Sequence, residues 1–173
     1  MSEHLTVASL SRLDRVAFVA AVGAVFEHSP WVMERAWAQR PFADRSAFLL
    51  ALDTVLHEAG RDLQLDLINA HPELAGKAAV RGDLTADSAR EQAGAGLNLC
   101  TPEEFASIQQ LNAAYREKFG WPFIIAVKGL SRQEIISEMA RRLARSAGDE
   151  FAEALAQILR IASLRLDDLL SGE

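Results

Sequence analysis

The sequence predicts an all-α protein, a single domain spanning residues 1–173 and built as a bundle of about eight helices. Three observations predict this class. Apolar residues recur at three- and four-residue steps along most of the chain, which is the period of a helix with one buried face. Residues that favour helix N-termini precede most of these stretches. Apolar residues make up 50% of the chain and charged residues 24%, a composition with which 173 residues bury a substantial core.

Two helices are predicted before residue 40. Ser11, with Asp14 three residues later, begins the first. Its inner positions share a 3.6-residue period and are Phe18, Val19, Val22, Val25 and Phe26. Ser29 and Pro30 supply the N-cap and the first residue of the second helix, which ends before Pro41.

The third and fourth helices lead to His71. Asp44 begins the third and Gly60 ends it. Its predicted core positions are Phe48, Ala51, Leu52 and Val55. The fourth presents Leu63, Leu67 and Ala70 to the core. Pro72 disfavours helical geometry at the residue before it, so this helix should end at His71.

The second half begins with a predicted loop over residues 72–84, which contains two glycines and two basic residues. Thr85 is the expected N-cap of the next helix. Thr101-Pro102-Glu103-Glu104 combines a capping box with proline at the first helical position, and the helix that it begins should end at about Phe119.

One short apolar stretch, residues 121–128, interrupts the helical pattern. It is partly β-branched and follows a glycine, and it is either a strand or an extended buried segment, which periodicity does not decide. Beyond it, a capping box at Ser131 begins a helix that reaches about Arg145. Asp149 begins the last helix, which should end near Gly172.

The composition excludes several classes of function. The formal net charge is −6 and the basic residues are scattered among acids, so we expect no nucleic-acid partner. The apolar run from Val16 to Phe26 is too short to cross a bilayer, so no membrane partner is expected. Cys100 is the only cysteine, which excludes an internal disulfide and favours a reducing, cytoplasmic location. We interpret Cys100 as a small buried hydrophobic residue.

His71 is the first candidate catalytic residue. An imidazole ordinarily titrates at a pH of about 6.5, so it can give or take a proton near neutral pH. The end of a helix, where carbonyls lack partners and the dipole favours a cation, suits it. The alternative is a structural histidine that is bonded only to those carbonyls.

Three polar side chains of the helix that follows Thr85 share one face. Ser88, Glu91 and Gln92 stand at three- and four-residue spacings. Glu91 could orient His71 or raise its basicity, as carboxylates do for catalytic imidazoles. The alternatives are a solvated face for Glu91 and a capping role for Ser88.

Arg165 interrupts the apolar stripe of the last helix. The other members of that stripe are Phe151, Leu155, Ile158, Ala162 and Leu169. An arginine in this position points to the core and needs an acceptor. Asp168, a carboxylate elsewhere and an anionic ligand are the alternatives. By contrast, we interpret Arg141, Arg142 and Arg145 as a solvated cluster at a helix end.

The motifs of metal and cofactor sites do not occur. Neither His28 nor His57 has a second histidine at ligand spacing, so we expect no metal site. There is no Gly-rich phosphate loop, GxSxG or dinucleotide fingerprint, so we expect no nucleotide or flavin cofactor.

Five stretches together are typical of one family. They are VFEHSPWV from Val25, QLDLINAHPELAGKAA from Gln64, SxxEQAGAGL from Ser88, LNAAYREKFGWPFIIAVKG from Leu111 and the final IASLRLDDLL. The sequence resembles the 2-oxo-4-hydroxy-4-carboxy-5-ureidoimidazoline (OHCU) decarboxylases, which act late in the oxidation of urate to allantoin. The resemblance implies an all-α bundle, a homodimer without a cofactor, and a pathway in which 5-hydroxyisourate hydrolase is a neighbouring enzyme.

The resemblance also implies roles for individual residues. His71 looks like the catalytic residue with Glu91 as its carboxylate partner, and Arg165 resembles the family arginine that grips the substrate. Pro72, Ser88 and Gln92 would line the pocket. The stretch whose backbone groups would bind the heterocycle comprises Phe123, Ile124, Ile125, Ala126 and Val127.

The implied reaction is decarboxylation of OHCU to S-allantoin, and it suits these residue types. The substrate carries its carboxylate beside a ring imine, so the ring can accept the electrons released with carbon dioxide. A positioned imidazole can then protonate one face of the enol-like intermediate. Two other functions stay open: a non-catalytic helical binding module, with Trp31 and Trp37 marking an interface, and a metal hydrolase.

Overall fold

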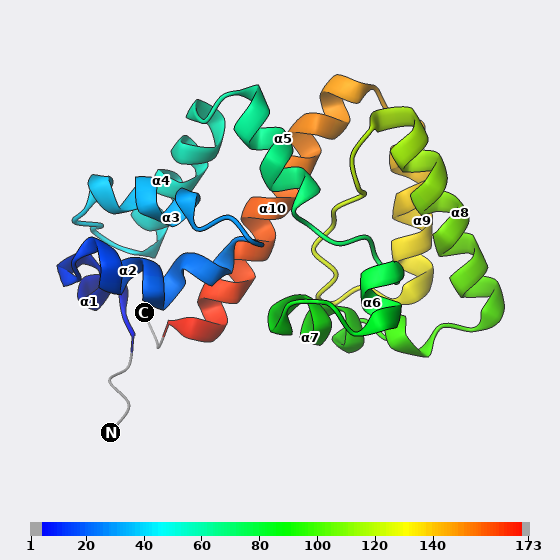
Figure 1. The fold of residues 1–173 in the computed structure, drawn as a ribbon, viewed down its shortest axis with the longest axis horizontal. Helices are drawn as coiled ribbons and strands as arrows, with labels where there is room; N and C mark the ends of the chain where they lie inside the picture. Colours follow the sequence, from blue (N-terminus) through cyan, green and yellow to red (C-terminus); the bar gives the residue numbers. More distant parts are fainter. Residues whose placement is uncertain (1–4, 171–173) are drawn as a thin grey trace. The chain divides into compact units, whose positions relative to one another are not determined.

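The computed structural model describes residues 5–170, and within that range the chain forms ten α-helices, three short 3-10 helices and no strand (Figure 1). The prediction of an all-α fold is confirmed. The helices outnumber the predicted eight because two short ones, α1 (Val7–Arg12) and α6 (Lys77–Arg81), lack a readable periodic pattern. The second of these lies inside the predicted loop 72–84.

The described chain gathers into two compact units. The first unit combines the chain up to Ala70 with the chain from Ile158 onward, and the second comprises His71–Gln157. The last helix, α10 (Ala147–Leu169), contributes residues to both units. The prediction of one domain over residues 1–173 stays a prediction.

The start of the first unit differs from the prediction in its capping residues. Ser11 lies inside α1, and the Asp14 carboxylate caps α2 (Arg15–Val22) by accepting the Ala17 N–H at 2.8 Å. Likewise Ser29 does not cap α3 (Trp31–Ala36), because its hydroxyl donates to the Glu27 carbonyl at 2.7 Å. Two 3-10 turns, Gly23–Val25 and Trp37–Gln39, extend these helices.

An aromatic cluster forms the core of the first unit. Asp44 caps α4 (Arg45–Glu58) as predicted, and the four predicted core positions of that helix are buried. Phe48 is fully buried, with its ring centroid 4.6 Å from that of Phe42 and 6.0 Å from that of Phe18. Helix α5 (Arg61–Asn69) then runs to the residues before His71.

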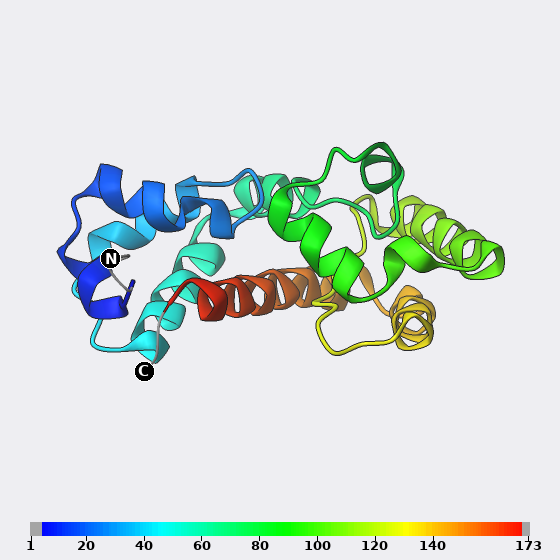
Figure 2. The ribbon, with the colours of Figure 1, turned by 90° about the horizontal axis from the view of Figure 1, so that it is seen from below.

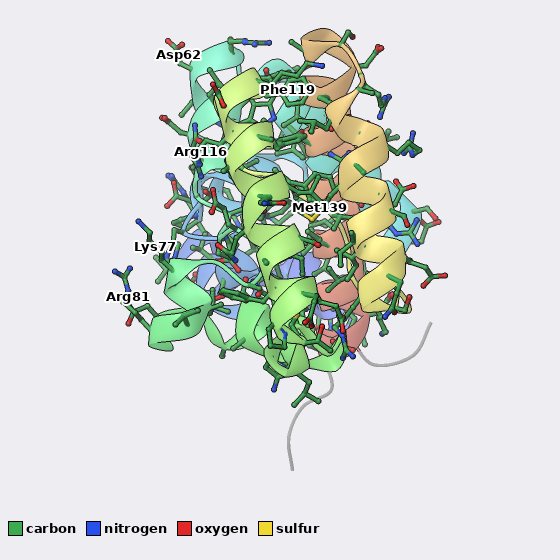
Figure 3. The ribbon with its side chains drawn as sticks, turned by 90° about the vertical axis from the view of Figure 1, so that its right-hand side faces the viewer. Asp62, Lys77, Arg81, Arg116, Phe119 and Met139 are labelled. Atoms are coloured by element: carbon green, nitrogen blue, oxygen red, sulfur yellow. The ribbon has the colours of Figure 1, made fainter. Side chains whose placement is uncertain are left out.

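The second unit contains α6, α7 (Ala86–Gly94), a 3-10 turn (Leu97–Leu99), α8 (Pro102–Phe119) and α9 (Arg132–Leu143). Helices α8 and α9 lie side by side, with the side chains of Phe119 and Met139 between them, whereas Lys77 and Arg81 of α6 lie at the rim (Figure 3). Both predicted capping boxes, at Thr101 and at Ser131, are present.

The stretch between α8 and α9 is neither helix nor strand, as Figure 1 and Figure 2 show for the yellow-green part of the chain. Gly120 ends α8 in a left-handed conformation with φ of 85°, which redirects the chain. The side chains from Trp121 to Val127 are all buried. Of the two alternatives for residues 121–128, the buried non-strand segment is therefore confirmed.

The last two helices are close to their predicted bounds. Helix α9 ends at Leu143 rather than Arg145, and α10 begins at Ala147, two residues before Asp149. The predicted end near Gly172 lies outside the described residues. Within residues 5–170 no helix combines the length and the apolar character that crossing a bilayer requires.

Candidate active site

His71 is buried at the first position of the second unit, with 8% of its surface exposed. Helix α5 ends at Asn69, and Ala70 caps it through bonds from its N–H to carbonyls of the last turn. The prediction that the helix stops where Pro72 follows His71 is confirmed. Burial here removes the imidazole from bulk water, which is the setting in which an acid-base group acts on a bound molecule.

The loop after His71 is held in place by polar side chains of α7 and α8. The Gln92 carboxamide accepts the Ala75 N–H at 3.0 Å and donates to the Glu73 carbonyl at 3.4 Å. From α8, Asn112 donates to the Leu74 carbonyl at 2.9 Å and Gln109 to the Ala75 carbonyl at 2.8 Å. These bonds fix the backbone that leaves His71, so the imidazole has a defined position.

The predicted polar face of α7 is the face that contacts this loop. Gln92 and Ser88 are buried and Glu91 is half-buried. Residues at positions i, i+3 and i+4 of a helix lie on one side, so Ser88 and Glu91 are on the side from which Gln92 binds the loop. The Thr85 hydroxyl caps the helix by accepting the Ser88 N–H at 3.3 Å, so Ser88 takes part in the cap through its backbone.

Arg165 is buried in the first unit, as its place in the apolar stripe predicts. Its Nη2 donates to the Glu27 carboxylate at 2.9 Å and its Nη1 to the Val25 carbonyl at 3.1 Å. Of the predicted alternatives, a carboxylate elsewhere is therefore one partner. Sequence reasoning missed Glu27, although a charged residue directly after the apolar run that ends at Phe26 was a readable signal.

The prediction of a solvated arginine cluster is wrong for Arg142. Its side chain is 1% exposed, and its Nε donates at 2.8 Å to Glu150, which is fully buried. Arg145, 31% exposed, donates to the other oxygen of the same carboxylate at 3.0 Å, while Arg141 is exposed. Ile135, Met139 and Arg142 form the buried stripe of α9, so periodicity could have identified this arginine.

Tyr115 completes this buried cluster. Its hydroxyl donates to the Glu150 carboxylate at 2.8 Å. Burial, followed by this hydrogen bond and the nearby negative charge, raises the pKa of Tyr115 well above its usual value. The tyrosine is thus a neutral donor that holds Glu150 for the arginines.

The predicted heterocycle-binding segment, from Phe123 to Val127, is anchored on both sides of Ile125. Arg142 Nη1 donates to the Ile124 carbonyl at 2.7 Å, and the Gln157 side-chain oxygen accepts the Ala126 N–H at 3.0 Å. Sequence reasoning missed Gln157. Nothing in the local pattern indicated that a glutamine of the last helix bonds this backbone.

The comparison with known proteins identifies the family. A family model described as OHCU decarboxylase matches residues 11–167. The chain belongs to the OHCU decarboxylase family. The OHCU decarboxylase of Halalkalicoccus jeotgali is 41% identical over 166 residues, which are 96% of this chain and 92% of that protein. The uric acid degradation bifunctional protein PucL of Bacillus subtilis is 38% identical over 96% of this chain, which spans 33% of that protein.

A solved structure gives the same family fold. The crystal structure of an (S)-allantoin synthase superposes with a TM-score of 0.76 at 25% sequence identity. The match covers 96% of this chain and 54% of that chain. The predicted family membership is confirmed, whereas the roles of the individual OHCU decarboxylase residues stay predictions.

A separate apolar cavity of about 610 Å³ lies between α6, α7 and the start of α8. Of the predicted site residues only Gln92 borders it, and most of its lining is alanine, leucine, valine and phenylalanine. Such a lining does not suit the carboxylated, polar substrate of OHCU decarboxylases. The predicted site residues His71, Ser88 and Glu91 lie outside the lining of this cavity.

Neither a thiolate nor a metal cluster is found at the candidate site. Burial raises the pKa of the Cys100 thiol, which donates to the Leu97 carbonyl at 3.3 Å, so the thiol is protonated at neutral pH. Cys100 borders the apolar cavity but is only partly buried, so the prediction of a buried residue is wrong. In the described part of the chain, no three side chains of histidine, cysteine, aspartate or glutamate gather in a group that could hold a metal ion.

Proposed function

We propose that this protein decarboxylates OHCU to S-allantoin in urate degradation, without a cofactor. The observation that carries the proposal is the family match over residues 11–167, with relatives named for this activity. The buried His71, on a loop fixed by the polar face of α7, supports an acid-base role at the residue that the family motif marks.

In the proposed reaction the bond between the ring carbon and the carboxylate carbon breaks, and carbon dioxide leaves. The bonding electron pair moves into the adjacent ring imine and gives an enol-like intermediate. One proton then adds to the neighbouring ring carbon, which bears the ureido group, while the hydroxyl on the carbon that lost the carboxylate gives up its proton and becomes a carbonyl. Delivery of the first proton to one face of the ring sets the S configuration. We assign this delivery to His71, with Glu91 orienting the imidazole and stabilising its charged form.

We assign Arg165 to the anionic groups of the substrate. Guanidinium binds carboxylate and ring oxygens through forked donors and stabilises negative charge as it develops. The bond to the Glu27 carboxylate supports this role, because it fixes the plane of the guanidinium. Pro72, Ser88, Gln92 and the backbone of residues 123–127 are proposed to line the substrate pocket.

We further propose a cytoplasmic homodimer that works beside 5-hydroxyisourate hydrolase. The single cysteine supports a reducing compartment. The Bacillus subtilis relative supports a pathway neighbour, since that protein is named bifunctional and this chain spans only a third of it. Size measurement in solution tests the homodimer, and assay of the two enzymes together tests the pathway neighbour.

The test of the activity is to generate OHCU in situ from urate and to follow the optical activity of the product. Wild-type protein should form S-allantoin faster than the uncatalysed decay, which has no preferred face. Equal rates with and without protein would refute the proposal. Binding of allantoin without turnover would instead favour a non-catalytic module.

Substitution of His71 sharpens the test. His71→Asn should lower turnover on the order of 10²- to 10⁴-fold, the usual contribution of general acid-base catalysis, with the fold intact by circular dichroism. His57→Asn is the matched control, because His57 lies on the surface of α4 with its side chain 64% exposed. Wild-type turnover in the His71 variant would remove this residue from the chemistry.

The alternative function, a non-catalytic binding module, relied on Trp31 and Trp37 to mark an interface, and the environment of Trp37 argues against this. Trp37 does not present a free ring, because its indole N–H donates to the Leu13 carbonyl at 3.1 Å. Its ring is also covered by the Arg40 guanidinium, 3.8 Å from the ring centroid. Trp37 therefore serves the packing of the first unit.

A further inference from the structure

The second unit holds residues 123–127 from both sides with two side chains that no family motif marks. Arg142 of α9 bonds the carbonyl of Ile124 at 2.7 Å, and Gln157 of α10 bonds the N–H of Ala126 at 3.0 Å. Between these anchors lies Ile125, which is buried. Within the described chain, no hydrogen bond from another residue reaches its N–H or its carbonyl. Buried backbone groups normally have a partner, so these two suit a bound ligand.

The Arg142 guanidinium is itself fixed by a buried network. Its Nε bonds Glu150, whose carboxylate also accepts the Tyr115 hydroxyl. Its Cζ lies over the Phe123 ring, 4.2 Å from the ring centroid, and the Tyr115 ring packs edge-on against the same ring with the centroids 5.3 Å apart. The arginine therefore holds both the backbone and the first side chain of the segment.

A purely structural ion pair between α9 and α10 would not need this geometry. Burying an arginine and a glutamate gives little or no net stability compared with apolar residues of similar size. Arg142 Nη2 moreover has no hydrogen-bond partner among the described residues, which adds a cost. What the arrangement does provide is a rigid donor, 2.7 Å from one particular carbonyl.

We propose that Arg142, oriented by Glu150, and Gln157 are positioning residues that fix the 123–127 backbone for substrate binding. The inference rests on the proposed function. Neither side chain is assigned to the reacting atoms. Together they hold the carbonyl before Ile125 and the N–H after it, so the polar groups of Ile125 keep one orientation toward the ring of the substrate.

The experiment compares KM and kcat for Gln157→Met and Arg142→Lys with those of the wild type. Methionine keeps the length of Gln157 but cannot accept the Ala126 N–H, and lysine keeps the charge beside Glu150 but loses the planar fork. We expect KM to rise on the order of tenfold in each, the equivalent of about one net hydrogen bond, while kcat changes much less. Gln64→Met is the matched control, because Gln64 bonds the backbone carbonyl of Leu56 in the first unit.

Comparing the changes in KM and kcat distinguishes a role in positioning the 123–127 backbone from a role in folding alone. A merely structural role would reduce the folded, active fraction and hence kcat, and would leave KM unchanged. That pattern, or unchanged kinetics in both variants, would overturn the inference while the proposed function stands. A wild-type protein without decarboxylase activity would overturn both. If Arg142→Lys fails to fold, Gln157→Met decides alone, because Gln157 is only partly buried.

Discussion

Replacing Glu150 by alanine tests how much the second unit depends on its buried charge cluster. The carboxylate is fully buried and accepts hydrogen bonds from Tyr115, Arg142 and Arg145. Its removal leaves the Arg142 guanidinium, 1% exposed, without a carboxylate, and breaking a buried pair in this way costs about 3–5 kcal/mol. For a chain of this size, each kcal/mol lowers Tm by about 2–4 °C, so Tm should fall by roughly 6–20 °C.

The assay is urea unfolding followed by circular dichroism, with Glu138→Ala as the matched control. The Glu138 carboxylate also accepts a hydrogen bond from Arg141 at 2.8 Å, but the side chain of Glu138 is 37% exposed and that of Arg141 is 57% exposed. Exposed pairs of this kind contribute about 0.2–1 kcal/mol. Loss of less than about 1 kcal/mol in Glu150→Ala, or equal losses in the two variants, would refute the reasoning from burial.

Three further predictions concern stability. Phe48→Ala should lower the free energy of unfolding by about 3–5 kcal/mol, whereas Leu50→Ala on the exposed side of α4 should change it by less than about 0.5 kcal/mol in the same urea titration. Thr101→Ala, which removes the capping hydroxyl of α8, should cost about 1 kcal/mol, and an unchanged midpoint would contradict this role. Folding raises the pKa of Tyr115, so the folded protein holds the phenolic proton more tightly than the unfolded chain does. The stability that Tyr115 contributes is therefore complete below a pH of about 10, the usual tyrosine value, and is lost as the pH rises further. Tyr115→Phe should therefore show a shallower loss of stability above that pH, and parallel curves for the two proteins would exclude the effect.

Local signals predicted much of the fold because the groups that begin a helix lie within three residues of each other. The Thr101 box, the Ser131 box and the Asp44 and Thr85 caps are all of this kind. Helix α6 has only five residues, too few to display a period, and was predicted to be loop.

The segment before α9 shows where local signals end. Its apolar residues fit a strand as well as a buried loop, and the partners that decide its path are Arg142, 18 residues after Ile124, and Gln157, 31 residues after Ala126. No spacing rule reaches that far along a chain. Glu27 itself had a local signal, but its pairing with Arg165, 138 residues away, could not be predicted for the same reason.

Helical periodicity predicts which charged residues are buried, provided that each residue is compared with the apolar stripe of its own helix. Arg165 was recognised because every other member of its stripe is apolar. Arg142 holds the equivalent position on α9, yet its proximity to Arg141 and Arg145 made it resemble a solvated cluster. Position relative to the period, rather than the charge of near neighbours, decides which arginine enters a core.

The division of the chain has a consequence for its biosynthesis. The second unit is one continuous stretch, His71–Gln157, whereas the first is assembled from both ends of the sequence. Because the chain is synthesised from its N-terminus, all residues of the second unit are made before Ile158 is added. The second unit thus needs no residue made after Gln157, whereas the core of the first unit is incomplete until the chain from Ile158 onward has been added.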